Sequence, residues 1–233
     1  MNVDSGLTLA SLNLHGGRRP GGSPFRVENA CTDLKADVIA LQEVWRPDGG
    51  PDEVGAAAAA LGAAAIHATL LSGATLGMLS IAPDPAPGTW GQAVITALPV
   101  AHYEEIPLGK APGDAVPRGA QVLTLELPDG GRLRIVNTHL THRLASPMQL
   151  LRLVRRLGPG SARTVIVGDL NMPGPVSGLA AGYSPAVTGR TFPAHRPFVQ
   201  LDHLLAGRGV TASEGEVAAP VGSDHLPIRA RLR

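Results

Sequence analysis

Short apolar segments separated by turn residues run along the whole chain, and they constrain its fold more than any other feature of the sequence. Such segments are typical of strands, and Pro128-Asp129-Gly130-Gly131 between two of them predicts a hairpin. Helical patterns are few and lie far apart, so the sequence favours an α/β fold with a sheet-on-sheet core and helices outside it. The predicted strands cover residues 7–14, 38–44, 91–97, 102–108, 120–127, 132–140, 164–167, 201–205 and 226–232.

Three segments predict helices, over residues 25–36, 52–61 and 146–157. The third has the clearest limits, because a capping box with proline at the first helical position begins it and Gly158-Pro159 follows it. Its leucines and valine fall on one face, which we expect to pack against a sheet. With no internal repeat and no low-complexity linker, the chain is predicted to be a single domain over residues 1–233.

The composition excludes some classes of protein. A formal net charge of +1 gives no overall basic field for nucleic acid, although a local groove of arginines needs no net charge. The single cysteine, Cys31, allows no intramolecular disulfide, and its place in an amphipathic helix predicts a packing residue. No apolar run approaches the ~20 residues of a membrane span, and the start of the chain lacks the pattern of a signal peptide. We therefore expect a cytoplasmic protein with no membrane partner.

Polar side chains of a restricted kind follow or end the predicted strands. Carboxylates, amides and imidazoles in these places would meet at a shared cleft if the strand ends open onto one face. Each motif is unremarkable alone, since GDLN could be an ordinary turn. In chain order, the residues are Asn13 in SLNLHG, Glu43 in LQEV, Asn137 and His139 in VNTHL, Asp169 and Asn171 in GDLN, Asp202 in QLDHL, and Asp224 and His225 in SDHLPI.

Together and in this order, the motifs resemble those of the endonuclease/exonuclease/phosphatase superfamily, from Ser11 to Ile228. The combination of LQE, GDLN and SDH is the most specific part of the resemblance. It implies a four-layer α/β sandwich, in which two packed, mostly antiparallel sheets are flanked by helices. It also implies a phosphoester hydrolase that depends on Mg²⁺, with Mn²⁺ as an alternative.

The chemistry of phosphoester cleavage accounts for these residue types. The phosphate charge must be neutralised, a water must be aligned with the leaving oxygen, and donors must face the developing negative charge. A hard cation held by a few oxygen ligands meets the first need. The chain has no cysteine cluster and no H-E-x-x-H spacing, which argues against a structural or peptidase zinc site.

The resemblance also assigns roles to individual residues. The metal ligands are Glu43 as the main ligand, Asn13 beside it, and Asp224 directly or through water. Asp169 orients and deprotonates the attacking water, and Asn171 holds a phosphate oxygen or positions that water.

The imidazoles and the remaining polar residues face the substrate. His139 and His225 donate to the non-bridging oxygens, and Asp202 fixes the tautomer of His225 and favours its charged form. Whether Asp169 or the His225–Asp202 pair is the general base stays open. Substrate-binding residues are Arg118 in PRGAQV, Asn137 and His15, whereas Gln92 stands where relatives often have asparagine and its role is doubtful.

Three functions are compatible with these motifs. The NTHL and LQEV segments resemble the branch that holds sphingomyelinases, inositol-phosphate phosphatases, deadenylases and related phosphodiesterases, rather than abasic-site nucleases. A compact chain with 3% aromatic residues favours a small soluble phosphodiester or phosphomonoester. A nuclease on DNA or RNA is the alternative, with basic residues around the cleft. An inactive binding module is disfavoured, because every expected acidic and histidine position is filled, and the sequence indicates no oligomeric state. The candidate arginines for nucleic acid are Arg18, Arg19, Arg118 and Arg143.

Overall fold

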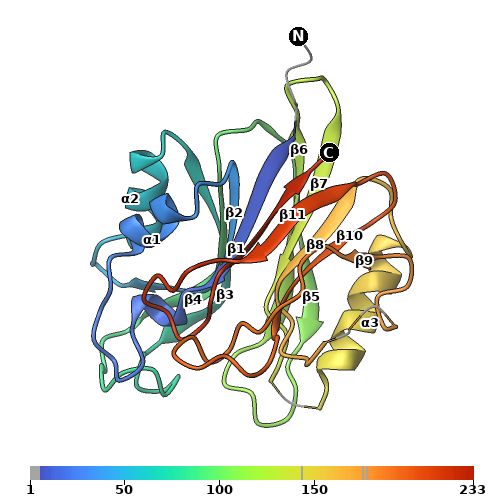
Figure 1. Cartoon of the computed structure of the whole chain (residues 1–233). Coiled ribbons are helices and arrows are strands. Elements are labelled where there is room, and N and C mark those ends of the chain that lie inside the picture. The colour runs from blue at the N-terminus through green and yellow to red at the C-terminus, as the bar shows by residue number, and fades with distance from the viewer. Residues whose placement is uncertain (1–5, 143, 175, 177) are drawn as a thin grey trace.

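Two six-stranded sheets pack face to face in the computed structural model, which describes residues 6–142, 144–174, 176 and 178–233 (Figure 1). The first sheet has the order β11-β12-β1-β2-β4-β3, and the second has the order β5-β6-β7-β8-β10-β9. The first sheet consists of β1 (Leu7–Asn13), β2 (Val38–Pro47), β3 (Ala64–Ala74), β4 (Gly88–Thr96), β11 (Ala212–Val217) and β12 (Ile228–Leu232). The second consists of β5 (Val100–Gly109), β6 (Arg118–Glu126), β7 (Arg132–Thr138), β8 (Thr164–Asp169), β9 (Ser184–Pro185) and β10 (Asp202–Ala206).

Helices cover the outer faces of both sheets. The helices α1 (Val27–Asp33) and α2 (Glu53–Ala60) lie beside the first sheet, and α3 (Ser146–Leu157) lies beside the second (Figure 1). Only the β1–β2 and β7–β8 pairs are parallel among the described strands, and the other pairs are antiparallel. The predicted sandwich of two mostly antiparallel sheets flanked by helices is therefore confirmed.

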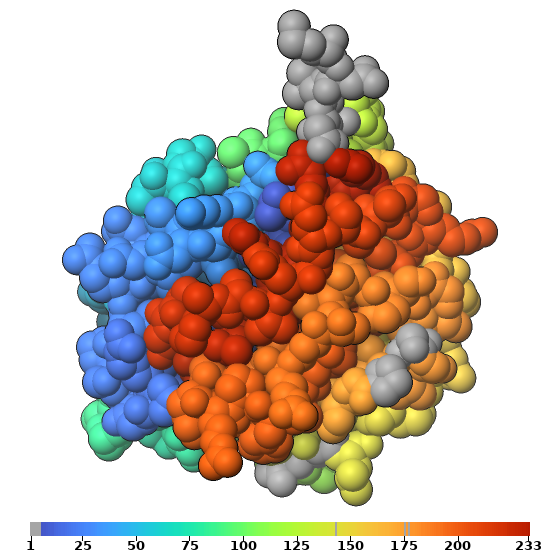
Figure 2. All heavy atoms as spheres, viewed as in Figure 1, coloured from blue at the N-terminus to red at the C-terminus, as the bar shows by residue number. Residues whose placement is uncertain are grey.

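Buried apolar clusters between the sheets and under the helices hold the sandwich together. Between the sheets, Leu9 and Val38 of the first sheet belong to one buried cluster with Ile135 and Val167 of the second. A second cluster joins α1 and α2 to the outer face of the first sheet. Another joins α3 to the second sheet through the apolar stripe that its sequence predicts. On the face shown in Figure 2, C-terminal segments in red lie between N-terminal segments in blue and the orange segments that precede them in the chain.

The structure differs from the predicted elements at several ends. The first helix covers residues 27–33 rather than 25–36, and β7 ends at Thr138 instead of continuing to residue 140. The strand β11 was not predicted, because its sequence ASEGEV has no apolar alternation and it lies at the edge of the sheet. No helix in the described part of the chain is long and apolar enough to span a membrane.

The thiol of Cys31 gives a direct test of the packing of α1. Its side chain is fully buried, and burial raises the pKa of the thiol to about 12. We expect no reaction of the native protein with 5,5′-dithiobis(2-nitrobenzoate) at mildly alkaline pH, and reaction of the single thiol after unfolding in urea. Absorbance at the thionitrobenzoate band measures both, and fast reaction in the folded state would contradict this packing.

Candidate active site

A cavity of about 390 Å³ lies at one end of the sandwich, where β1, β7 and β8 end. Its lining combines acidic, amide, imidazole and guanidinium groups with an apolar rim that includes Trp90 and Phe192. These residues come from segments far apart in the sequence and from both sheets. The polar lining consists of Asn13, His15, Glu43, Arg118, His139, His142, Asp169, Asn171, Asp224 and His225.

Asp169 is the most strongly surrounded carboxylate in this cavity. Its oxygens accept hydrogen bonds from Asn13 Nδ2 at 3.0 Å and from the backbone N–H of Asn171 at 2.9 Å. Two imidazole nitrogens also face it, His139 Nε2 at 3.5 Å and His225 Nε2 at 3.7 Å. Burial raises the pKa of Asp169 to about 7, although the His225 charge opposes the shift. A carboxylate in this state can take up and release a proton near neutral pH.

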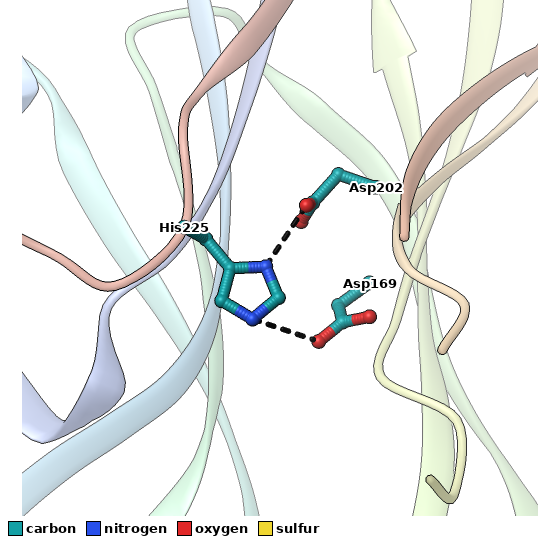
Figure 3. A group of neighbouring side chains, drawn as sticks. All are labelled: Asp169, Asp202 and His225. Atoms are coloured by element: carbon teal, nitrogen blue, oxygen red, sulfur yellow. Dashed lines mark hydrogen bonds and ion pairs between the residues drawn. The ribbon is translucent and has the colours of Figure 1, made fainter. Parts of the chain in front are cut away.

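His225 lies between two acidic side chains that would otherwise repel each other (Figure 3). Asp169 of β8 and Asp202 of β10 are direct partners across antiparallel strands, and like charges in such positions destabilise a sheet. His225 Nδ1 lies 2.9 Å from Asp202 Oδ2, and its other nitrogen faces Asp169. Burial disfavours the charged imidazole, but the Asp202 and Asp169 carboxylates outweigh it and raise the pKa of His225 to about 10. The ring is therefore a cation that relieves the repulsion.

Hydrogen bonds to the backbone hold this chain of groups in place. Thr191 Oγ1 accepts from the N–H groups of Leu201 and Asp202, at 3.0 and 3.2 Å. Ser223 Oγ donates to the carbonyl of Asn13 at 2.6 Å and accepts from the N–H of His225 at 3.2 Å. Ser223 was not among the predicted site residues, although it begins the SDH motif. It fixes His225 to the end of β1.

A second acidic group lies across the cavity around His15. The Nδ1 atom of His15 is 3.6 Å from Glu43 Oε2 and 3.5 Å from Asp224 Oδ2, and His139 Nδ1 is 3.7 Å from Glu43 Oε1. Burial opposes the charge on Glu43, but the hydrogen bond from His15 and the surrounding imidazoles outweigh it and lower the pKa of Glu43 to about 2. Neither Glu43 nor Asp224 has a lysine or arginine partner among the described residues.

Two sets of residues could hold a divalent cation. Glu43 and Asp224 offer carboxylate oxygens, the ligands that Mg²⁺ and Mn²⁺ prefer, and imidazoles are their only basic partners among the described residues. Asp169, Asp202 and His225 also place one ligand atom each within 4.8 Å of one another. In that second set, the cation would have to displace a proton from His225, whose two nitrogens already face carboxylates. The first set therefore fits the ion better.

The backbone around the cavity is unusual. His15, Glu43 and Asn171 have φ angles of 48°, 53° and 51°, in the left-handed region that residues other than glycine seldom adopt. Glu43 lies at a bulge where β2 loses its register with β4, and bulges re-aim side chains in this way. Close approach also accounts for Gly168 in the GDLN motif, because a β-carbon there would lie 2.0 Å from the carbonyl oxygen of Thr138.

Arg118 and His139 form the remaining polar wall of the cavity. Arg118 is only 9% exposed, and it has no carboxylate within 4.0 Å in the part of the chain that the structure describes. Its buried Nε has no hydrogen-bond partner among the described residues. Burial and the Arg118 charge together hold the pKa of His139 well below its usual value, so this imidazole is neutral. His139 Nε2 lies 3.0 Å from Asn171 Nδ2, an arrangement that places the ring proton on Nδ1, toward Glu43.

The structure corrects the prediction that Asn137 binds substrate. This side chain is fully buried between the sheets, away from the cavity. Its Nδ2 donates to the carbonyls of Leu41 and Ala93, both at 3.0 Å, and its Oδ1 accepts from Gln42 Nε2 at 2.7 Å. Gln92 lies in the same buried network and donates to the Asn137 carbonyl at 3.3 Å. Both residues connect strands and do not face a ligand.

The other predicted site residues are brought together. Asp202 does not line the cavity, but it makes the predicted hydrogen bond to His225. His142, to which the sequence assigned no role, also lies in the cavity wall. Arg143 lies outside the described residues.

Comparisons with known proteins identify the family and the fold of the chain. A model of the endonuclease/exonuclease/phosphatase family matches residues 10–225. An endonuclease/exonuclease/phosphatase structure from Beutenbergia cavernae DSM 12333 is 21% identical, with 98% of this chain and 72% of that chain covered and a TM-score of 0.77. The human Nocturnin catalytic domain with bound sulfate is 17% identical, with 98% and 93% covered and a TM-score of 0.72.

A third structure, D. rerio TDP2 complexed with single-strand DNA product, is 17% identical, with 99% and 100% covered and a TM-score of 0.67. At these identities, the likeness concerns the fold. No curated protein sequence matches the chain.

Replacing Asn137 tests its structural role. We expect Asn137→Ala to lower the free energy of unfolding by about 2 kcal/mol or more, since each buried group left unpaired costs roughly 1–3 kcal/mol. Urea unfolding followed by circular dichroism measures this, with the exposed Asn29→Ala as the matched control. If the variant is as stable as the native protein but binds substrate more weakly, Asn137 is a substrate-binding residue after all.

Proposed function

The chain belongs to the endonuclease/exonuclease/phosphatase family, whose members are hydrolases and typically metal-dependent phosphoesterases, and from that premise we propose that it hydrolyses a small soluble phosphodiester or phosphomonoester. The proposal covers residues 1–233 as one domain with Mg²⁺, or Mn²⁺, as its cofactor. The observation that carries it is the position of Asp169, which faces two amide donors and two imidazoles in a cavity with two further carboxylates.

The metal ion would be held by Glu43 and Asp224, with the Oδ1 atom of Asn13 beside them. Asn13 Oδ1 already accepts from the N–H of His15 at 3.0 Å, which fixes its direction and leaves it a second lone pair. When bound, the ion supplies positive charge that neutralises the phosphate oxygens. His15 faces both carboxylates, and we assign it to substrate binding.

Asp169 would orient the attacking water and accept its proton. Asn13 and the backbone of Asn171 hold the carboxylate rigidly, which is the positioning that an in-line attack needs. Geometry favours Asp169 over the His225–Asp202 pair as the base, because both nitrogens of His225 face carboxylates and serve as donors. Asp202 keeps that imidazole oriented.

Cationic and neutral donors would stabilise the charge that develops on the phosphate. His225 would donate to a non-bridging oxygen from Nε2, beside Asp169, and the neutral His139 would donate from Nδ1, on the side that faces Glu43. Asn171 donates from Nδ2 to the Leu140 carbonyl at 3.0 Å, which holds it against this group. Arg118 is a buried guanidinium with no acidic partner in the described chain, and an incoming phosphate would supply one.

A nuclease is the alternative function, and one surface feature favours it. Arg19 and Arg26 line a depression of about 650 Å³ that reaches Ser223, the neighbour of Asp224. A nucleic acid strand whose scissile phosphate lay at Asp169 could continue across these arginines. The complex of TDP2 with single-strand DNA product concerns that protein and offers the same possibility for this chain.

Metal dependence is the first test of the proposed chemistry. We expect the purified protein to hydrolyse bis(p-nitrophenyl) phosphate with Mg²⁺ or Mn²⁺ and to stop after chelation, because Glu43 and Asp224 have no lysine or arginine partner in the described chain. Release of p-nitrophenol measures the rate, and adding the ion back should restore it. Undiminished turnover after exhaustive chelation would remove the metal from the proposal.

Substitution of the central acid and its imidazole partner is the second test. We expect Asp169→Asn and His225→Ala each to lower kcat by roughly 10²–10⁴-fold, the usual loss when an acid–base group is removed. The exposed Asp48→Asn is the matched control and should keep the native rate. Urea unfolding establishes that each variant is folded, and native rates in both folded variants would refute the assignment of this site.

A further inference from the structure

A larger cavity of about 910 Å³ adjoins the candidate active site and is unused by the proposed chemistry. Ligand-binding pockets commonly have volumes of roughly 300–1,000 Å³. His142 and Asn171 line both cavities, so a molecule with its phosphate at Asp169 would extend past them into the larger one. We call this larger cavity the groove. Its apolar lining comes from Ala111, Pro112, Leu144, Ala145, Pro147, Met172, Pro173, Val176 and Leu179.

The walls of the groove are held by buried hydrogen bonds. Asp114 accepts from Thr141 Oγ1 at 2.7 Å and from the N–H of Ala111 at 3.2 Å, and this ties one wall to the segment after β7. Gln149 of α3 accepts from the N–H of Thr141 at 2.9 Å. On the opposite wall, His203 Nε2 lies 2.9 Å from the carbonyl oxygen of Met172. The groove is therefore formed before any ligand enters.

The chemistry of the lining identifies the kind of group that it suits. Its described residues are mostly aliphatic and include no aromatic ring on which a nucleobase could stack. The polar lining groups are His142, Ser146 and Asn171, and Ser146 is buried. At the rim, the side chain of Leu144 is fully exposed, which leaves apolar surface in water next to the site.

We propose that the groove binds an alkyl group of the substrate. The protein would then hydrolyse an amphiphilic phosphoester. The phosphate lies at Asp169, and the alkyl part passes His142 and Asn171 to reach the aliphatic walls. This inference rests on the proposed function, because the position of the phosphate determines which part of the ester enters the groove.

A series of p-nitrophenyl alkyl phosphates tests it, since the phosphate and the leaving group stay constant while the alkyl chain grows from methyl through butyl to octyl. We expect kcat/KM to rise by up to about fourfold for each methylene that enters the groove, from the transfer of apolar surface out of water. Equal values along the series, or faster hydrolysis of thymidine 5′-(p-nitrophenyl phosphate) than of the octyl ester, would overturn the proposal.

Leu144→Asp places a charge at the rim of the groove, and Leu61→Asp is its matched control on the opposite side of the sandwich, at the end of α2. The side chain of Leu144 is fully exposed and that of Leu61 is 37% exposed, and neither belongs to a buried apolar cluster of the described residues. We expect the ratio of octyl to methyl kcat/KM to fall about tenfold or more in Leu144→Asp and to stay native in Leu61→Asp. A native ratio in Leu144→Asp would count against the groove.

Binding without turnover separates this inference from the proposed function. We expect the Asp169→Asn variant to bind octylphosphonate at least tenfold more tightly than methylphosphonate in titration calorimetry. If the variant shows this preference but the native protein hydrolyses no ester, the alkyl-binding groove is supported and the proposed hydrolase activity is contradicted. If the protein hydrolyses all the esters with no preference for chain length, the hydrolase activity is supported and the alkyl-binding groove is contradicted. This holds whether the octyl ester is monomeric or in phosphatidylcholine vesicles.

Discussion

The buried contact between Asn137 of β7 and Gln42 of β2 determines how the two sheets lie against each other at the end that holds the cavity. An apolar interface alone tolerates small shifts of one sheet against the other. A buried amide does not, because its hydrogen bonds require both the right distance and the right direction to each partner. Asn137 also donates to the carbonyls of Leu41 and Ala93, so one side chain of the second sheet joins two strands of the first. The residue after Gln42 is Glu43, and His139 is two residues past Asn137. The same contact therefore places the carboxylate of Glu43 3.7 Å from the imidazole of His139.

The charged contacts of the cavity cross the same boundary between the sheets. Asn13, at the end of β1, reaches Asp169 at the end of β8, and His225, which precedes β12, reaches Asp202 at the start of β10. In each pair, a donor from the first sheet meets a carboxylate from the second. Without this meeting, Asp169 and Asp202 would be adjacent carboxylates in an antiparallel pair with no cation between them. The arrangement of the site and the packing of the sheets therefore depend on each other.

Local signals in the sequence predicted the parts of this arrangement that depend on local structure. The helix α3 has its predicted limits, because Pro147 in its first turn and Gly158 after its last residue act locally. The predicted capping box does not form: Ala145 is the N-cap, no side chain caps the first turn, and Gln149 accepts from the N–H of Thr141 instead. Asn137 was assigned to the cavity since it shares a motif with His139, yet β7 ends between the two, so Asn137 faces the buried network and His139 faces the cavity. The bulge at Glu43 depends on the register with β4, a distant segment, and the sequence of β2 gives no signal of it. Likewise, the polar edge strand β11 exists because β12 offers it hydrogen bonds, which no pattern within β11 reveals.

Apart from His142 and Asn171, which line both, the two cavities are built from different parts of the fold, and this separates the proposed chemistry from substrate recognition. The polar cavity takes side chains from both sheets, at strand ends and at a bulge whose positions the sandwich determines. The groove, in contrast, is lined by the connections after β5, β7 and β8 together with the first turn of α3, all of which belong to the second sheet. Loops of this kind accept changes in length and side chain that strands in a core do not. A change in the groove can thus alter which ester fits while Asp169, His225 and Glu43 keep their positions, and this is how one fold can serve many substrates.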